Sequence, residues 1–453
     1  ASAATKTYSV ACTGGEVSYY NSNVSYFSND TRVSIYCSNK GSFTITVEPN
    51  TSTSSRTITL YSKKGNGTTV DTLRISQSGI ATKTINVGCT GGNYSHGIPG
   101  AYSISSTNTA ICSSLASNKN YLVIKPNTSC NSRSCRVTVK NSVGRIIGLV
   151  TINQSGVPTK TINAACTGGN MYYYNANASS YIYSNTSVCN SRSNNNFVVK
   201  PNTTTSARNC TVTVKNSSGK VIAYVYIKQA AVPVKTVSAS GDSGAKFSYG
   251  NSNVTNFSYS SSYVSKVTAS NPGSFTLYLK ENPSPSKTRT FDIIAKNSKG
   301  AYVEIIRVTQ AKHTVTSITL NVPCTGGKVY YSNSIASSYS YSSTAVCNSR
   351  SGNYFVVNPN STTAARTCTV TVKNSAGEVV GYVYIKQSAV PTKTINAACT
   401  GGNYTHGISG VYSATSDNTS ICSGLTSDKK SLIVKPSTST SVRDCKVTLK
   451  NSS

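Results

Sequence analysis

The sequence predicts an all-β protein built as a tandem array of six small β-sandwich domains, and three observations support this prediction. A stretch of alternating apolar and polar residues, CTVTVKNSSGKVIAYVYIKQ at positions 210–229, returns with variations near Thr57, Cys135, Thr290, Cys368 and Cys445. A second marker, CTGG, begins at Cys12, Cys89, Cys166, Cys324 and Cys399. The composition, with 30 Tyr and no Trp, favours exposed β-structure with little helix.

The stretch at 210–229 predicts a β-hairpin. Cys210, Val212 and Val214 share one face of an extended chain, while the intervening Thr and Lys residues share the other. Residues 216–219, Asn-Ser-Ser-Gly, tolerate left-handed backbone angles and predict the turn. The return strand 221–228 again alternates small apolar residues with larger or polar ones. Because two strands alone are marginal in water, this hairpin must pack its apolar face on a second sheet.

The spacing of the markers predicts six domains, each small enough to bury only a modest core. The predicted domains are residues 1–79, 80–156, 157–231, 232–312, 313–389 and 390–453. The fourth is the outlier, because it reads Gly-Asp-Ser-Gly from Gly241 in place of CTGG and contains no cysteine. Short links with Pro, such as residues 156–159, limit the swing between neighbours and predict a semi-rigid rod.

The sixth unit ends in the turn of its hairpin, so by comparison with the other units its final strand is missing. A sandwich without that strand exposes a sheet edge, which proteins usually cover or avoid. Two explanations stay open at this point. Either the sequence is part of a longer array, or a strand of a neighbouring subunit fills the gap by donor-strand complementation and builds a fibre.

The hairpins share an Arg at the start of one strand and a Gln at the end of the other. The Arg recurs as Arg56, Arg133, Arg208, Arg289, Arg366 and Arg443, and the Gln as Gln77, Gln154, Gln229, Gln310 and Gln387. Together with the Gly-Gly turn, these features resemble the BACON-type bacterial Ig-like domain (Bacteroidetes-associated, carbohydrate-binding, often N-terminal) over all six units. The resemblance implies Ig-like β-sandwiches of secreted enzymes, surface proteins or gut-phage virions, where such domains often act as spacers.

The 15 cysteines fall at three recurring positions, which favours a disulfide framework in an oxidising compartment. The first position precedes Gly-Gly, the second lies in the middle strand, and the third follows the recurring Arg by two residues. Unit one has Ile58 at the third position, and unit four has Gly241, Ala269 and Phe291 at the three positions. The third position therefore tolerates a large apolar side chain.

The most economical pairing joins the first position to the second, and pairing of the first with the third is the rival. The predicted pairs are Cys12 with Cys37, Cys89 with Cys112, Cys166 with Cys189, Cys324 with Cys347, and Cys399 with Cys422. Cys130 is a further candidate partner for Cys135, and Cys210, Cys368 and Cys445 are expected as buried thiols.

Charge and motif content exclude several function classes. With 43 Lys+Arg against 12 Asp+Glu, the net charge of +31 should attract polyanions, yet Lys is spread over every unit without an Arg-rich arm, so nucleic acid is an unlikely partner. No carboxylate pair, nucleophile set or zinc motif recurs, so we expect no enzyme activity, cofactor or metal. No apolar run is long enough to span a membrane.

The remaining candidate for recognition is the outer face of the hairpin's last strand. Units three and five place Tyr and Lys side by side there, at Tyr224, Tyr226 and Lys228 and at Tyr382, Tyr384 and Lys386. Such a surface suits sugars, anionic polymers or another protein. The competing interpretation is that Tyr simply favours exposed strands and stabilises cross-strand pairs.

The sequence therefore predicts a non-enzymatic extracellular structural or adhesive protein, a rod or fibre subunit of a surface appendage or virion that self-associates or joins a larger assembly. The alternative is an array that binds carbohydrate, such as mucin or anionic glycans, through repeated weak sites.

Overall fold

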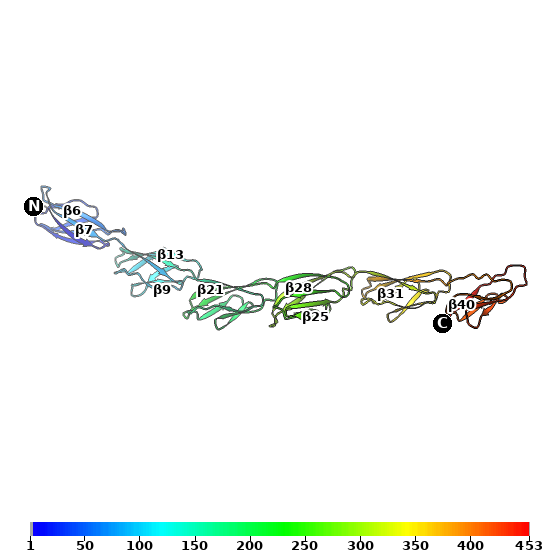
Figure 1. The fold of residues 1–453 in the computed structure, drawn as a ribbon. Coiled ribbons are helices and arrows are strands. Elements are labelled where there is room, and N and C mark those ends of the chain that lie inside the picture. The colour runs from blue at the N-terminus through cyan, green and yellow to red at the C-terminus, as the bar shows by residue number, and fades with distance from the viewer. Residues whose placement is uncertain (1–2, 453) are drawn as a thin grey trace. The chain divides into compact units, whose positions relative to one another are not determined.

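The computed structural model describes residues 3–452, and every element in it is a strand (Figure 1). The strands form tandem Ig-like β-sandwiches, as the alternation of apolar and polar residues predicts. Among the described residues no helix exists that could cross a membrane. The chain divides into two compact units: one holds the first three repeats with part of the fourth, and the other holds the rest of the fourth with the fifth and sixth.

Each of the first three repeats has seven strands. Repeat one contains β1 (Ala4–Val10), β2 (Gly15–Tyr20), β3 (Tyr26–Phe27), β4 (Val33–Asn39), β5 (Ser42–Val47), β6 (Arg56–Lys63) and β7 (Thr69–Gln77). Repeat two contains β8 (Ala81–Val87), β9 (Gly92–Ser95), β10 (Ser103–Ser106), β11 (Cys112–Leu115), β12 (Tyr121–Ile124), β13 (Arg133–Lys140) and β14 (Ile146–Gln154). Repeat three contains β15 (Thr159–Ala164), β16 (Gly169–Tyr172), β17 (Ser180–Tyr183), β18 (Cys189–Ser193), β19 (Asn196–Val199), β20 (Arg208–Lys215) and β21 (Val221–Gln229).

Repeats four and five follow the same order, and the described part of repeat six has five strands. Repeat four contains β22 (Val234–Ala239), β23 (Lys246–Gly250), β24 (Asn256–Ser258), β25 (Val264–Asn271), β26 (Ser274–Leu279), β27 (Arg289–Lys296) and β28 (Tyr302–Gln310). Repeat five contains β29 (Thr316–Val322), β30 (Gly327–Tyr330), β31 (Ser338–Tyr341), β32 (Cys347–Ser351), β33 (Tyr354–Val357), β34 (Arg366–Lys373) and β35 (Val379–Gln387). Repeat six contains β36 (Gly402–Thr405), β37 (Ser413–Ser416), β38 (Cys422–Leu425), β39 (Ser431–Val434) and β40 (Val447–Lys450).

In each of the first five repeats, a four-stranded sheet takes its first, seventh, sixth and third strands in that order, and a three-stranded sheet takes the second, fifth and fourth. Each sheet is formed by strands that lie within a single predicted domain. The last strand forms a hairpin with the sixth and pairs in parallel with the first, as where β15 pairs with β21 and Ile162 lies opposite Ile227. The hairpin is thus the centre of the larger sheet.

The β20–β21 hairpin forms as the sequence predicts. Cys210 lies opposite Ile227 and Val212 opposite Val225, so both apolar sets share one face. The turn residue Asn216 accepts hydrogen bonds through its side-chain oxygen from the backbone N–H groups of Ser218 (3.1 Å) and Lys220 (2.9 Å). Gly219 closes the turn at a φ of 74°, which favours glycine.

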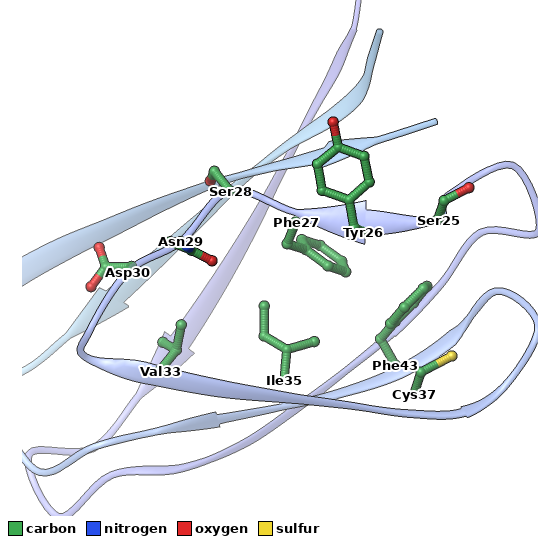
Figure 2. A pocket seen from close by; sticks show the side chains of 10 residues that line it. All are labelled: Ser25, Tyr26, Phe27, Ser28, Asn29, Asp30, Val33, Ile35, Cys37 and Phe43. Atoms are coloured by element: carbon green, nitrogen blue, oxygen red, sulfur yellow. The ribbon is translucent and has the colours of Figure 1, made fainter. Parts of the chain in front are cut away.

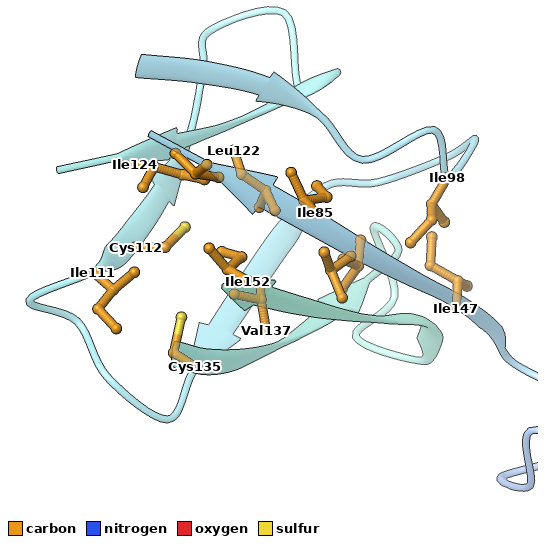
Figure 3. Packing of buried hydrophobic residues seen from close by; sticks show 13 residues of the cluster. Ile85, Ile98, Ile111, Cys112, Leu122, Ile124, Cys135, Val137, Ile147 and Ile152 are labelled. Atoms are coloured by element: carbon orange, nitrogen blue, oxygen red, sulfur yellow. The ribbon is translucent and has the colours of Figure 1, made fainter. Parts of the chain in front are cut away.

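In repeats one, two, three and five, the two sheets bury one apolar core. In repeat two the core contains Leu122 from the smaller sheet and Val137 and Ile152 from the larger one, all fully buried (Figure 3). Burial of a Val, Leu or Ile side chain contributes about 1.5–3 kcal/mol, so such a cluster is the main source of stability for each repeat.

The first strand of repeat six is absent from the structure. Residues 391–398 form no strand, although the matching residues 159–164 form β15. Sheet β37–β40 of this repeat has two strands. In repeats one, two, three and five, the first strand pairs with the last. Among residues 3–452, repeat six has no last strand after β40, so residues 391–398 have no strand to pair with.

Candidate functional site

Two of the predicted recognition tyrosines lie at the junction between repeats two and three. The hydroxyl of Tyr224 donates a hydrogen bond to the carbonyl of Thr128 at 2.9 Å, and the hydroxyl of Tyr226 lies 3.6 Å from the sulfur of Cys130. The contact with Cys130 raises the pKa of Tyr226 above its ordinary value. These tyrosines join neighbouring repeats, whereas Lys228 is exposed.

The matching residues of repeat five are arranged differently. The rings of Tyr382 and Tyr384 stack at 6.4 Å between centroids, and Tyr384 and Lys386 are exposed. The junction with repeat four uses the hairpin turn instead. There the side chain of Asn374 donates to the carbonyl of Pro283 at 2.7 Å, and Glu378 accepts hydrogen bonds from Ser284 and Ser286. The hydrogen bond from Ser286 is the largest cause of a lowered pKa at Glu378.

The CTGG turns also lie at junctions. The sulfur of Cys166 contacts the carbonyl of Tyr302 at 3.4 Å, where it packs with Val232 and Ile305. The sulfur of Cys89 likewise contacts the carbonyl of Val221 at 3.8 Å.

At the junction of repeats one and two, the guanidinium of Arg145 donates a hydrogen bond to the carbonyl of Thr13. The turn after the first strand therefore meets the start of the next repeat's last strand at three successive junctions.

The link between repeats four and five places a histidine beside two acids. His313 is 7% exposed, and its Nδ1 lies 3.1 Å from a carboxylate oxygen of Glu281 and 3.3 Å from one of Asp242. Asp242 also accepts hydrogen bonds from the backbone and hydroxyl of Thr314, at 2.8 and 3.0 Å. The backbone bond is the largest cause of the lowered pKa of Asp242, and the charge of His313 adds to it.

An arginine surrounded by aromatic rings is a feature that our sequence analysis missed. The Arg192 guanidinium lies 4.2 Å from the Tyr181 ring centroid and donates to the carbonyl of Tyr173 at 2.7 Å. Beside it is an open hollow of about 370 Å³ whose lining includes Tyr174. Repeat five repeats the arrangement with Arg350 and Tyr339 at 4.4 Å. The shared CNSRS motif of β18 and β32 was the available signal.

A second hollow, of about 360 Å³, lies in repeat one between β3 and β4. Phe27, Ile35 and Phe43 point into it (Figure 2). Asp30, at its edge, is held by Arg32 through bonds of 2.5 and 2.8 Å, which lower the pKa of this carboxyl. The hollow is thus an opening between the two sheets with apolar side chains at its floor and polar residues around it, and its one lining acid is already paired.

The disulfide pairs expected from the sequence are not formed, and all fifteen cysteines are free. The strand register also corrects the assignment of the second position. Cys112 pairs with Ile124, and the residue at the same place in repeat one is Val33, which pairs with Val47. In repeat four it is Val264, opposite Leu279. Cys37 and Ala269, which we expected at this position, lie farther along their strands.

The predicted pair of Cys130 with Cys135 is also not formed, and the two residues lie in different surroundings. Cys130 is exposed in a loop that faces Tyr226, whereas Cys135 is buried in the core of repeat two. Of the first-position cysteines, Cys12, Cys89 and Cys324 are half-buried and Cys399 is exposed.

Among residues 3–452, no group of three or more His, Cys, Asp or Glu side chains has an arrangement that could hold a metal ion. The recurring His96 bonds to backbone through both ring nitrogens: Nε2 lies 2.7 Å from the carbonyl of Lys119, and Nδ1 lies 3.0 Å from the N–H of Ile98. His406 makes the same contacts with Lys429 and Ile408.

No family model and no curated protein matches the chain. Among solved structures, the chain is similar to SGBP-B of the Bacteroides ovatus mixed-linkage glucan utilization locus, solved with a mixed-linkage heptasaccharide, at 12% identity and a TM-score of 0.15 over 62% of this chain and 74% of that one. It is similar to cadherin-like domains 1 to 4 of zebrafish RET at 9% identity and a TM-score of 0.19, over 86% and 99%. Values this low carry no argument about function, and the fold class rests on the sheets described above.

Proposed function

We propose that this protein is a non-enzymatic extracellular structural or adhesive repeat protein, a semi-rigid fibre segment of a surface appendage or virion, built from BACON-type Ig-like repeats. The observation that carries the proposal is the hydrogen bond from Tyr224 of repeat three to Thr128 of repeat two. Contacts of this kind fix neighbouring repeats to one another, and a fibre segment under load needs such contacts.

The links themselves support this proposal. In each of five links, one backbone N–H donates to a carbonyl of the preceding repeat. The five bonds, of 2.8 or 2.9 Å, join Ile80 to Ser52, Val157 to Ser129, Val232 to Thr204, His313 to Ser284, and Val390 to Thr362. The first four of these link residues are also buried. A link that is both hydrogen-bonded and buried has little freedom to swing, unlike a Gly/Ser linker.

Assembly by donor-strand complementation is the more specific form of this proposal. Residues 391–398 carry the sequence of a first strand but pair with no strand in the structure. A strand with the alternation of β21 would supply the partner that β15 has. In donor-strand complementation, a neighbouring copy supplies that strand.

A peptide test addresses this missing pairing directly. The peptide VIAYVYIKQ, copied from residues 221–229, should bind the 453-residue chain and slow amide exchange at 391–398. A peptide with Lys at its Val and Ile core positions is the matched control. If neither peptide binds, donor-strand assembly is excluded. Electron microscopy of the native material then decides the source of the strand, since filaments with density completing repeat six indicate a neighbouring copy.

Glycan binding is the second candidate, and the hollow beside Arg192 favours it. Tyr174, which lines this hollow with an arginine and several amide side chains, is 60% exposed, which suits stacking and hydrogen bonding to a sugar. Binding to mucin that Tyr174→Ala removes, while Tyr20→Ala on the exposed face of repeat one leaves it intact, would support this function. Equal binding by all variants would exclude this site.

A further inference from the structure

The second and third cysteine positions face each other across the core in four repeats. The second-position cysteines begin strands of the smaller sheet, at Cys112, Cys189, Cys347 and Cys422, and are fully buried or nearly so. Of the third-position cysteines, Cys135, Cys210 and Cys368 lie on strands of the larger sheet, and Cys445 precedes β40. In repeats two, three and five, both members belong to the same apolar cluster.

The side chains of the pairs in repeats two and three are close. In repeat two the sulfur of Cys135 is directed toward Cys112 (Figure 3). In repeat three the sulfur of Cys210 lies 4.0 Å from the carbonyl oxygen of Cys189, so this side chain reaches the opposite sheet. These two pairs therefore span the two layers of their sandwiches.

The two positions also change together along the chain. Repeat one has Val33 and Ile58 at these places, and repeat four has Val264 and Phe291. No repeat combines a cysteine at one of the two positions with an apolar residue at the other. If the cysteines only filled space, as buried thiols do, mixed combinations would be tolerated. The joint replacement indicates that each cysteine is useful only when the other is present.

We propose that Cys112 with Cys135, Cys189 with Cys210, Cys347 with Cys368, and Cys422 with Cys445 form disulfides that bridge the two sheets when the chain folds in an oxidising compartment. In each pair two S–H bonds break and one S–S bond forms, and the two thiols lose two electrons and two protons. A disulfide oxidant, either a thiol–disulfide oxidoreductase or oxidised glutathione, takes them up and becomes two thiols.

Cys112 and Cys347 are fully buried, so an oxidant reaches them only while the sandwich is open, and we expect the bond to form before the core closes. Burial raises the pKa of Cys112 to about 11, and the thiol of Cys135 across the core adds to the rise. Burial likewise raises the pKa of Cys347 to about 11. Because the thiolate is the reactive form, thiols of the folded reduced protein exchange slowly, and those of an opened sandwich exchange readily. The first-position cysteines remain thiols, and two of them, Cys89 and Cys166, contact the following repeat.

The test is a map of linked cysteines in the whole chain. The 453-residue protein is unfolded with reductant, refolded in a glutathione redox buffer, and alkylated with iodoacetamide in denaturant without further reduction. Peptide mass spectrometry should find the four pairs named above and alkylated Cys12, Cys37, Cys89, Cys130, Cys166, Cys324 and Cys399. Before alkylation, the intact mass of the refolded protein should be eight hydrogens below that of the reduced chain. Links such as Cys166 to Cys189, or alkyl groups on the eight core cysteines, would overturn the proposal.

A second variant separates a cross-link from core packing. Cys189→Val with Cys210→Ile reproduces the pair found in repeat one, so the protein should fold and lose only one link. Reductant should speed amide exchange in repeat three of the wild type by at least about tenfold and leave the double variant unchanged. Repeat one, which has Val33 and Ile58, is the internal control. Equal acceleration in both proteins would contradict a link between these residues.

Discussion

Gln229 accepts two hydrogen bonds from the Arg208 guanidinium, at 2.7 and 3.1 Å, at the open end of the β20–β21 hairpin. The amide group of the same Gln donates to the carbonyls of Lys200 at 2.8 Å and Cys166 at 3.3 Å. The side chain is 1% exposed, so it ties together three segments inside the protein. The matching Gln side chains of repeats one, two, four and five accept from their own Arg in the same way.

Replacing this glutamine should destabilise repeat three strongly. Gln229→Leu removes bonds to a charged group and leaves buried carbonyls without donors, at a cost of about 3 kcal/mol. Amide exchange of β20 and β21 should accelerate by roughly a hundredfold, since about 1.4 kcal/mol corresponds to a factor of ten. Lys228→Ala on the exposed face is the control and should change exchange by less than about threefold. Similar rates in both variants would show that the Gln is dispensable.

The junction tyrosines should couple repeats two and three. Tyr224→Phe with Tyr226→Phe removes both hydroxyls that reach repeat two, and the hydrogen bond to Thr128 is worth about 1 kcal/mol. Limited proteolysis at the link 156–158 should therefore become several-fold faster. Tyr382→Phe with Tyr384→Phe is the matched control, because these rings stack on each other. If both double variants are cleaved at the wild-type rate, the tyrosines do not stiffen the junction.

A buried asparagine fixes the loop before the hairpin. Asn202 is fully buried, and its amide donates to the carbonyls of Ser206 at 2.8 Å and Ala230 at 2.9 Å. Asn202→Ala should cost about 2–3 kcal/mol, measured by amide exchange in repeat three, because both carbonyls lose their donor. Asn163→Ala on exposed β15 is the control.

The same geometry predicts that Asn202 resists glycosylation, although Asn202-Thr203-Thr204 is an acceptor sequence. After expression in a glycosylating cell, the tryptic peptide with Asn202 should be unmodified in folded protein. Full glycan occupancy at Asn202 would contradict this prediction.

Acid should loosen the link between repeats four and five. The pKa of Asp242 is lowered below its usual 3.8 by the backbone of Thr314 and by His313. A carboxyl with a lowered pKa stabilises the folded state above its unfolded pKa, and this contribution is lost as the pH falls through the folded value. Amide exchange at 313–316, corrected for intrinsic rates, should therefore rise below about pH 4. Asp242→Asn should abolish this dependence, and an unchanged dependence in that variant would assign it to another group.

Period-two alternation and turn residues were enough to predict the strands, the hairpins and the repeated sandwich, because these depend on residues close together in the chain. The recurring Arg and Gln were visible in the sequence as a pattern without a role. Their bond became visible only in the structure, because Arg208 and Gln229 meet through the register of two strands.

The cysteines show the same division. Counting along the sequence assigned Cys37 and Cys112 to the same position of their repeats, because both follow a CTGG marker at a similar distance. Strand register places Val33 there instead, since repeat one has the longer β4 and β5. Which thiols face each other depends on how two sheets stack, and stacking joins residues that no local pattern connects. The sequence by itself therefore determined the repeat and its strands, while the tertiary structure decided which side chains meet across the core and at the junctions.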